Sequence, residues 1–171
     1  MDEVEIANYD PRWPLLFEEE AKRLRAVLDP SLIVGLEHFG STAISGLPAK
    51  PIIDILIAVR SLAAARATLV ETLRNLDYVY WADNPKKDRM FFVKGMPPFG
   101  SNRSHHVHVT EPDGEMWRRL AFRDYLRAHP EEAATYERLK RRLAAEHPAD
   151  REAYSDAKSA YVESVMQKAI K

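Results

Sequence analysis

The segment PIIDILIAV, residues 51–59, constrains the fold more than any other part of the sequence. It is rich in isoleucine and apolar on both alternating faces, which is typical of a strand buried on both sides in an α/β protein. Its one charged residue is Asp54, which shares a strand face with Ile52 and Leu56. An ionised carboxylate in such surroundings requires a metal, a cation or several N–H donors.

The flanking segments predict an α/β fold in a single domain, with an α/β part over about residues 1–113 and a helical part over about 114–171. Ser61 is a plausible N-cap of the second helix. Helical spacing of apolar residues predicts helices over residues 14–28, 61–76, 115–129, 131–147 and 151–171. Short β-prone runs predict further strands over residues 31–39, 78–81, 90–95 and 105–111.

Composition and charge exclude several classes of protein. The net charge of −1 provides no overall basic surface, so we expect no DNA binding, although a local basic cluster can still bind phosphate. The chain has no cysteine, which excludes disulfides and thiolate metal sites.

The acidic N-terminal stretch does not resemble a signal peptide and no apolar run reaches membrane-spanning length, so we predict a cytoplasmic protein that does not bind membranes. We assign four late arginines to solvated helix faces: Arg118, Arg119, Arg141 and Arg142.

The loop GSTAISGLPAK, residues 40–50, follows the first predicted strand. Backbone N–H groups and hydroxyls of Gly40, Ser41 and Thr42 are suited to cradling a phosphate group, and Ser41 or Thr42 can begin a short helix there. Lys50, just before the Asp54 strand, can pair with phosphate or balance Asp54. A simple turn at Gly40-Ser41 and a solvated loop lysine are the alternatives.

The run HHVHVTE, residues 105–111, places His106 and His108 on one strand face. Two imidazoles at alternate positions are a credible half of a metal site that Asp54 would complete. The alternative is a pair of hydrogen-bonded strand histidines. Arg103 precedes the cluster, where it can neutralise a phosphate or lie exposed in a loop.

Four stretches of this sequence resemble the GrpB family: EHFGSTAISGLPAKPIIDI, HHVHV, FRDYLRAHP and YDPRWP. The resemblance covers nearly the whole chain. It implies a nucleotidyltransferase-like fold, in which helices surround a small mixed β-sheet, and a relationship to the domain fused to some bacterial dephospho-coenzyme A kinases.

The wider nucleotidyltransferase superfamily has Gly-Ser after a strand, then two acids that flank an apolar residue, and later a third acid. Gly40 and Ser41 match this pattern, and Asp54 fits the first acid after 12 intervening residues. The second acid position holds Leu56, and His106 and His108 stand where the third acid is expected. One carboxylate with two imidazoles favours Zn²⁺, Mn²⁺ or a similar ion over paired Mg²⁺.

The resemblance implies no particular substrate, and our first hypothesis from the pattern and the site residues is metal-dependent transfer of a nucleotidyl group from a nucleoside triphosphate (NTP) to an unknown acceptor. A divalent metal, Mg²⁺, Mn²⁺ or Zn²⁺, is the expected cofactor, and a small phosphate-containing molecule is the expected ligand. A non-catalytic nucleotide- or phosphoester-binding module and a metal-dependent phosphohydrolase are the alternatives. The predicted roles are catalysis for Asp54, Ser41 and Arg103, ligand binding for Gly40, Ser41, Thr42 and Lys50, and metal binding for Asp54, His106 and His108.

Overall fold

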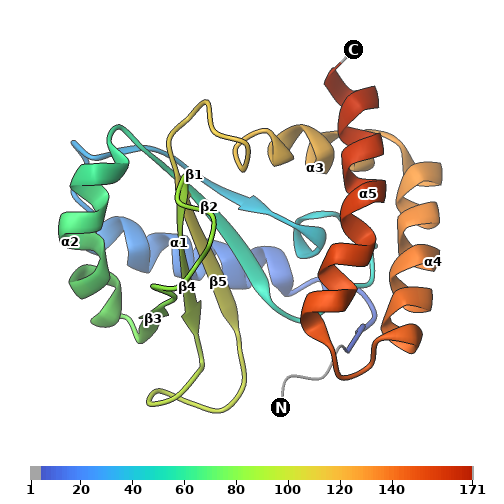
Figure 1. Cartoon of the computed structure of the whole chain (residues 1–171), viewed down its shortest axis with the longest axis horizontal. Coiled ribbons are helices and arrows are strands. Elements are labelled where there is room, and N and C mark those ends of the chain that lie inside the picture. Colours follow the sequence, from blue (N-terminus) through green and yellow to red (C-terminus); the bar gives the residue numbers. More distant parts are fainter. Residues whose placement is uncertain (1–4, 171) are drawn as a thin grey trace.

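A computed structural model describes residues 5–170 and confirms the predicted mixed α/β fold (Figure 1). The helices are α1 (Trp13–Val27), α2 (Leu62–Arg74), α3 (Arg119–Ala128), α4 (Pro130–Glu146) and α5 (Arg151–Ile170). The strands are β1 (Ile33–Phe39), β2 (Ile53–Val59), β3 (Tyr78–Tyr80), β4 (Arg89–Lys94) and β5 (His105–Thr110). A short 3₁₀ helix, η1 (Ser41–Ala43), follows β1. No helix among the described residues is long and apolar enough to cross a membrane, and residues 1–4 of the acidic start lie outside the description.

The strands form one mixed sheet in the order β1-β2-β5-β4-β3. β2 runs parallel to β5, and the other neighbouring pairs are antiparallel. The isoleucine-rich β2 is thus an interior strand with partners on both sides, as its sequence predicts.

One face of the sheet is covered by α1 and α2. Ile53, Ile55 and Ile57 point to this face, where they pack in the largest buried cluster with α1 and α2 side chains. The predicted cap of α2 is confirmed, because the Ser61 hydroxyl accepts a hydrogen bond from the Ala64 backbone N–H.

The opposite face of the sheet is turned toward the C-terminal helices. Figure 1 shows α4 and α5 side by side, at the other end of the molecule from α2. These helices and α3 form a second core around Ile44 and Leu47, which belong to the loop between β1 and β2. This loop therefore connects the sheet to the helical part and lies between them.

The predicted start of the third helix at residue 115 is wrong, because α3 begins at Arg119. Residues 115–118 instead form turns, in which the Arg119 N–H bonds to the Met116 carbonyl. Met116 packs against Phe39 and Leu56 on the sheet, with Trp117 beside them. The turn places these two apolar side chains on the sheet, which helical spacing alone does not anticipate.

Candidate functional site

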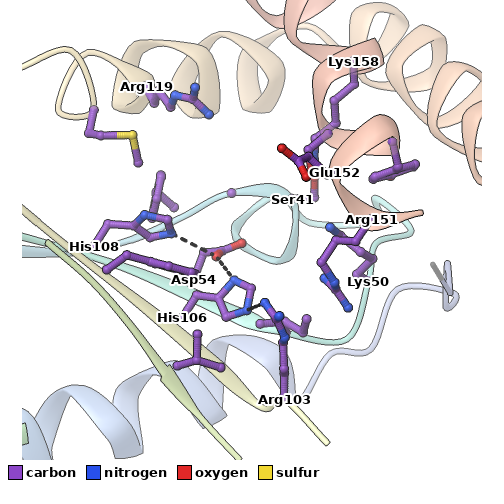
Figure 2. Close-up of a pocket in the computed structure, with 18 of the residues that line it drawn as sticks. Ser41, Lys50, Asp54, Arg103, His106, His108, Arg119, Arg151, Glu152 and Lys158 are labelled. Carbon is purple, nitrogen blue, oxygen red and sulfur yellow. Dashed lines mark hydrogen bonds and ion pairs between the residues drawn. The ribbon is translucent and has the colours of Figure 1, made fainter. Parts of the chain in front are cut away.

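A cavity of about 940 Å³ lies between the second face of the sheet and the helical part. Every residue that the sequence assigns to the site lines this cavity, including residues from β2, β5 and the two connections β1–β2 and β4–β5 (Figure 2). They are Gly40, Ser41, Thr42, Lys50, Asp54, Arg103, His106 and His108. The fold thus brings together residues that are up to 68 positions apart, from Gly40 to His108.

Asp54, His106 and His108 form a compact cluster on the cavity side of the sheet. Asp54 is paired with His106 across the parallel β2–β5 ladder, so their side chains share one face. Asp54 Oδ1 lies 3.4 Å from His106 Nδ1 and 3.6 Å from His108 Nε2. Two ligands of a tetrahedral zinc ion, each about 2.0–2.1 Å from it, are separated by roughly 3.3 Å. The three side chains therefore fit the spacing of a metal site, and their ligand atoms all lie within 4.8 Å of one another.

The protonation states of the cluster also suit a metal. Burial opposes ionisation of Asp54, but His106 and His108 outweigh it and lower the pKa of the carboxyl. Burial lowers the pKa of His106 although Asp54 favours its charged form. At neutral pH this leaves a carboxylate beside a neutral imidazole, which are the forms that bind divalent ions.

Arg103 lies on the other side of the His106 ring. Its Nη1 is 3.4 Å from His106 Nε2. Since a guanidinium can only donate, this contact requires Nε2 to accept and Nδ1 to carry the ring proton toward Asp54. Metal binding through Nδ1 would move that proton to Nε2, and Arg103 would then have to turn away.

Gly40 brings the loop backbone against Asp54. Its φ of 73° and ψ of −174° fall in a region that only glycine adopts readily. A Cβ at this position would lie 2.6 Å from Asp54 Oδ2. The absence of a side chain thus allows the Gly40-Ser41 turn to approach the carboxylate.

Ser41 begins the 3₁₀ helix that the sequence predicts at this point. The next residue, Thr42, is buried, and its hydroxyl lies 2.9 Å from His38 Nε2. His38 is stacked on Phe17, and its burial lowers its pKa to about 4 despite the nearby Asp54 charge. A neutral His38 therefore holds Thr42, and with it the turn, from the α1 side of the sheet.

The sequence did not identify the contribution of α5. Arg151, Tyr154 and Lys158 all line the cavity, and their i, i+3, i+7 spacing places them on one face of that helix. This spacing is visible in the sequence once the helix is assigned. Arg119 was predicted to be solvated, but it is partly buried and lines the cavity from the start of α3 (Figure 2). The prediction is correct for Arg118, Arg141 and Arg142, which are exposed.

The fold and site define a mixed α/β protein with a two-histidine, one-carboxylate cluster on an open sheet face. The sequence pattern of the GrpB protein family matches residues 3–168. The chain belongs to the GrpB family.

Similar proteins support this assignment over nearly the whole chain. A UPF0157 protein of Pseudomonas aeruginosa is 47% identical over 170 residues, which cover 99% of this chain and 69% of that protein. The crystal structure of conserved protein GrpB from Enterococcus faecalis matches with a TM-score of 0.85 and 35% identity, covering 97% of both chains. A dephospho-CoA kinase of Mycolicibacterium paratuberculosis is 31% identical, over 97% of this chain and 46% of that protein. The predicted relationship to a dephospho-coenzyme A kinase is thereby confirmed.

Proposed function

We propose that this protein is a metal-dependent nucleotidyltransferase that acts on an NTP and a separate acceptor. The observation that carries the proposal is the placement of Asp54, His106 and His108 beside the Gly40-Ser41 turn, in one cavity that also contains basic side chains. A cluster of metal-ligand type next to an anion-binding turn is suited to phosphoryl chemistry.

The donor set supports one divalent ion of the zinc or manganese type. It offers a single carboxylate oxygen and two imidazole nitrogens, whereas Mg²⁺ prefers oxygen ligands alone. Leu56 at the second acid position is fully buried and packs with Phe39 and Met116, so no second carboxylate extends from that position. A bound ion would supply positive charge to the phosphoryl oxygens of the ligand.

The remaining groups suit the other parts of an NTP. We assign hydrogen bonding to phosphate to the Gly40-Ser41 backbone and the Ser41 hydroxyl, and neutralisation of its charge to Lys50 and Arg103, because all four residues line the cavity. Trp81 also lines the cavity, is 48% exposed and makes an edge-on contact with Phe91, whose ring contacts both imidazoles. The exposed Trp81 ring offers a stacking surface for a base.

A metal-dependent phosphohydrolase and a binding module without turnover are the competing functions. The lack of an acid at Leu56 favours them, because transfer assisted by two metals needs more oxygen ligands. The products separate the three functions. A transferase releases pyrophosphate only when the acceptor is present, a phosphohydrolase releases product from the NTP alone, and a binding module releases nothing.

The first test is thermal unfolding of the wild type and Asp54→Asn with ATP, CTP, GTP or UTP, each with Mg²⁺, Mn²⁺ or Zn²⁺. Ligand at about a hundred times its dissociation constant adds roughly 2.7 kcal/mol, which raises the midpoint by several degrees. We expect a metal-dependent shift that disappears in Asp54→Asn and persists in the exposed control Asp113→Asn. Equal shifts in all three proteins would rule out Asp54 as the nucleotide site, and no shift for any nucleotide would overturn the proposal.

A further inference from the structure

The helical side of the cavity carries an unusual group of cations around one tyrosine. Lys50 Nζ lies 4.9 Å from the centre of the Tyr154 ring, and Lys158 Nζ lies 5.2 Å from it. Arg151 lines the cavity one turn before Lys158 on α5 (Figure 2). We call Lys50, Arg151, Tyr154 and Lys158 the α5 wall.

The two lysines of the α5 wall are not neutralised by carboxylates. Among residues 5–170, neither Lys50 nor Lys158 forms an ion pair, although the exposed Glu152 and Asp156 also line the cavity. Burial and the charges of Lys158 and Arg151 lower the pKa of Lys50 to about 7. Cations gathered in a concave, partly desolvated site attract an anion, which would relieve their mutual repulsion.

Tyr154 provides an independent observation. Its side chain is fully buried, yet within the described part of the chain its hydroxyl has no hydrogen-bond partner. Burial raises the pKa of this hydroxyl, so it remains a donor. Buried polar groups are nearly always hydrogen-bonded in folded proteins, so an unsatisfied donor on a residue that lines the cavity supports a ligand at this end of the cavity.

We propose that the α5 wall binds the terminal phosphates of a polyphosphate ligand, while Gly40, Ser41 and Asp54 face the phosphate that reacts. This inference rests on the proposed function and deepens it, because it selects a triphosphate over a monophosphate. It also gives the helical part a role in substrate choice, since Arg151, Tyr154 and Lys158 all belong to α5.

The test uses inorganic tripolyphosphate and orthophosphate as probes, measured by isothermal titration calorimetry at physiological salt with EDTA present. Lys158→Gln removes one cation, and Tyr154→Phe removes only the hydroxyl. Lys168→Gln is the matched control, because it makes the same charge change on α5 at a residue that is paired with Glu132. We expect tripolyphosphate to bind the wild type more tightly than orthophosphate does. Lys158→Gln should weaken tripolyphosphate binding about tenfold, and Tyr154→Phe should weaken it severalfold.

Either of two tripolyphosphate results would overturn the inference. Unchanged tripolyphosphate affinity in both Lys158→Gln and Tyr154→Phe would exclude the α5 wall as the binding site. If Lys168→Gln weakened binding as much as Lys158→Gln does, the effect would come from the net charge of the protein and not from this site. Asp54→Asn separates this inference from the proposed function. It should retain tripolyphosphate binding in EDTA while losing metal-dependent NTP binding. If metal-dependent NTP binding requires Asp54 but is unaffected by Lys158→Gln, the proposed function stands and the α5 wall fails.

Discussion

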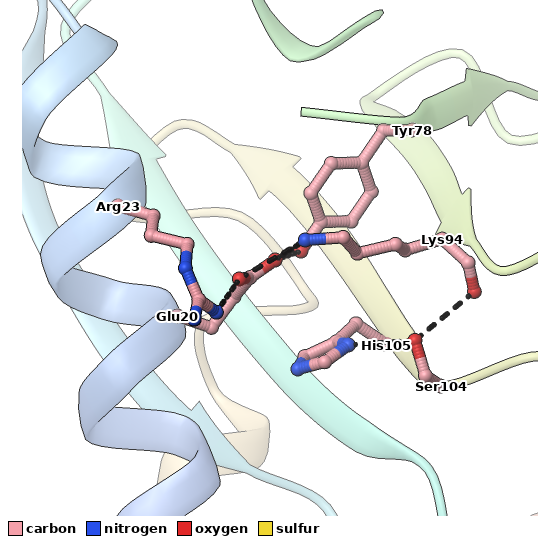
Figure 3. Close-up of polar contacts among 6 residues, drawn as sticks. All are labelled: Glu20, Arg23, Tyr78, Lys94, Ser104 and His105. Carbon is pink, nitrogen blue, oxygen red and sulfur yellow. Dashed lines mark hydrogen bonds and ion pairs between the residues drawn. The ribbon is translucent and has the colours of Figure 1, made fainter. Parts of the chain in front are cut away.

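Two carboxylates lie on opposite faces of the same sheet, and their surroundings differ. Glu20 of α1 is fully buried and is surrounded by donors (Figure 3). Lys94 Nζ lies 3.1 and 2.8 Å from its two oxygens, the Tyr78 hydroxyl donates to it at 2.6 Å, and Arg23 Nη1 donates at 3.0 Å. Glu20 is thus neutralised within its own chain.

The Asp54 carboxylate has fewer and more distant polar partners than Glu20. Its side chain is 27% exposed, and its neighbours are two imidazole nitrogens at 3.4 and 3.6 Å. In the described part of the chain, no lysine or arginine forms an ion pair with it. Glu20 has the environment of a structural carboxylate, whereas Asp54 has unused acceptor capacity that faces a cavity. The comparison supports a stabilising role for Glu20 and our proposal that Asp54 binds a ligand.

The largest effect on stability is expected from Glu20→Gln. Removing one partner of a buried ion pair leaves the other charge uncompensated, which costs about 3–5 kcal/mol. For a chain of this size, that lowers the unfolding midpoint by roughly 10 °C. Thermal and urea unfolding measure the change, with the exposed neighbour Glu19→Gln as control. A loss below about 1 kcal/mol would contradict the structural role of Glu20.

Two buried groups on the α1 face of the sheet, His38 and Glu20, should also differ in their response to pH. The pKa of His38 is 6.5 when unfolded and about 4 when folded, so the unfolded state binds the extra proton and stability falls as pH decreases between these values. The loss reaches about 3 kcal/mol at pH 4. The pKa of Glu20 is lowered from 4.5, because Lys94 and Tyr78 outweigh its burial, so its contribution is lost only below that pH.

Urea unfolding between pH 7 and 4 tests this separation. His38→Gln should flatten the decline, while His147→Gln, an imidazole outside the sheet, should leave it unchanged. An unchanged slope in His38→Gln would mean that another group causes the loss.

Gly40→Ala is expected to have a smaller effect on stability but a local effect on the site. The strained backbone at φ 73° costs about 1–3 kcal/mol in a non-glycine residue. The added Cβ also displaces the Asp54 carboxylate, 2.6 Å away. Gly46→Ala is the matched control, because its φ is 81° but nothing lies within 4 Å of the new Cβ. Unfolding and metal titration should show that both variants lose stability, and that only Gly40→Ala loses metal affinity. Equal metal affinity in both would contradict the close approach at Gly40.

The smallest stability change is expected from Asp54→Asn in metal-free buffer. The nearest imidazole nitrogens lie 3.4 and 3.6 Å away, beyond the usual range of N–H···O hydrogen bonds, so the amide gives up little direct interaction. We expect a loss of about 1 kcal/mol by urea unfolding. A loss as large as that of Glu20→Gln would place both carboxylates in the same structural class.

The sequence predicts one of these two regions much better than the other. The isoleucine-rich β2 and the alternation of His106 and His108 predict the shared face of the cluster, because strand periodicity fixes which side chains lie together. Lys94 and Tyr78 meet Glu20 only after β3, β4 and α1 pack, and no local pattern encodes that contact. The α5 wall was missed for the same reason. Its spacing defines a helix face, but only tertiary packing places that face against the cavity.

The central claim is that Asp54 is a ligand-binding carboxylate and Glu20 a structural one. Metal titration is the most direct test of this claim. Isothermal titration calorimetry with Mn²⁺ and with Zn²⁺ would be performed on the wild type, Asp54→Asn and Glu20→Gln, at a temperature where all three are folded. We predict that the wild type and Glu20→Gln each bind one ion. Asp54→Asn should bind it at least a hundredfold more weakly, because it loses one of three protein ligands. This loss exceeds the roughly 10- to 100-fold effect of losing an outer-shell partner. Equal binding by Asp54→Asn and the wild type, or no binding of either ion by the wild type, would contradict the claim.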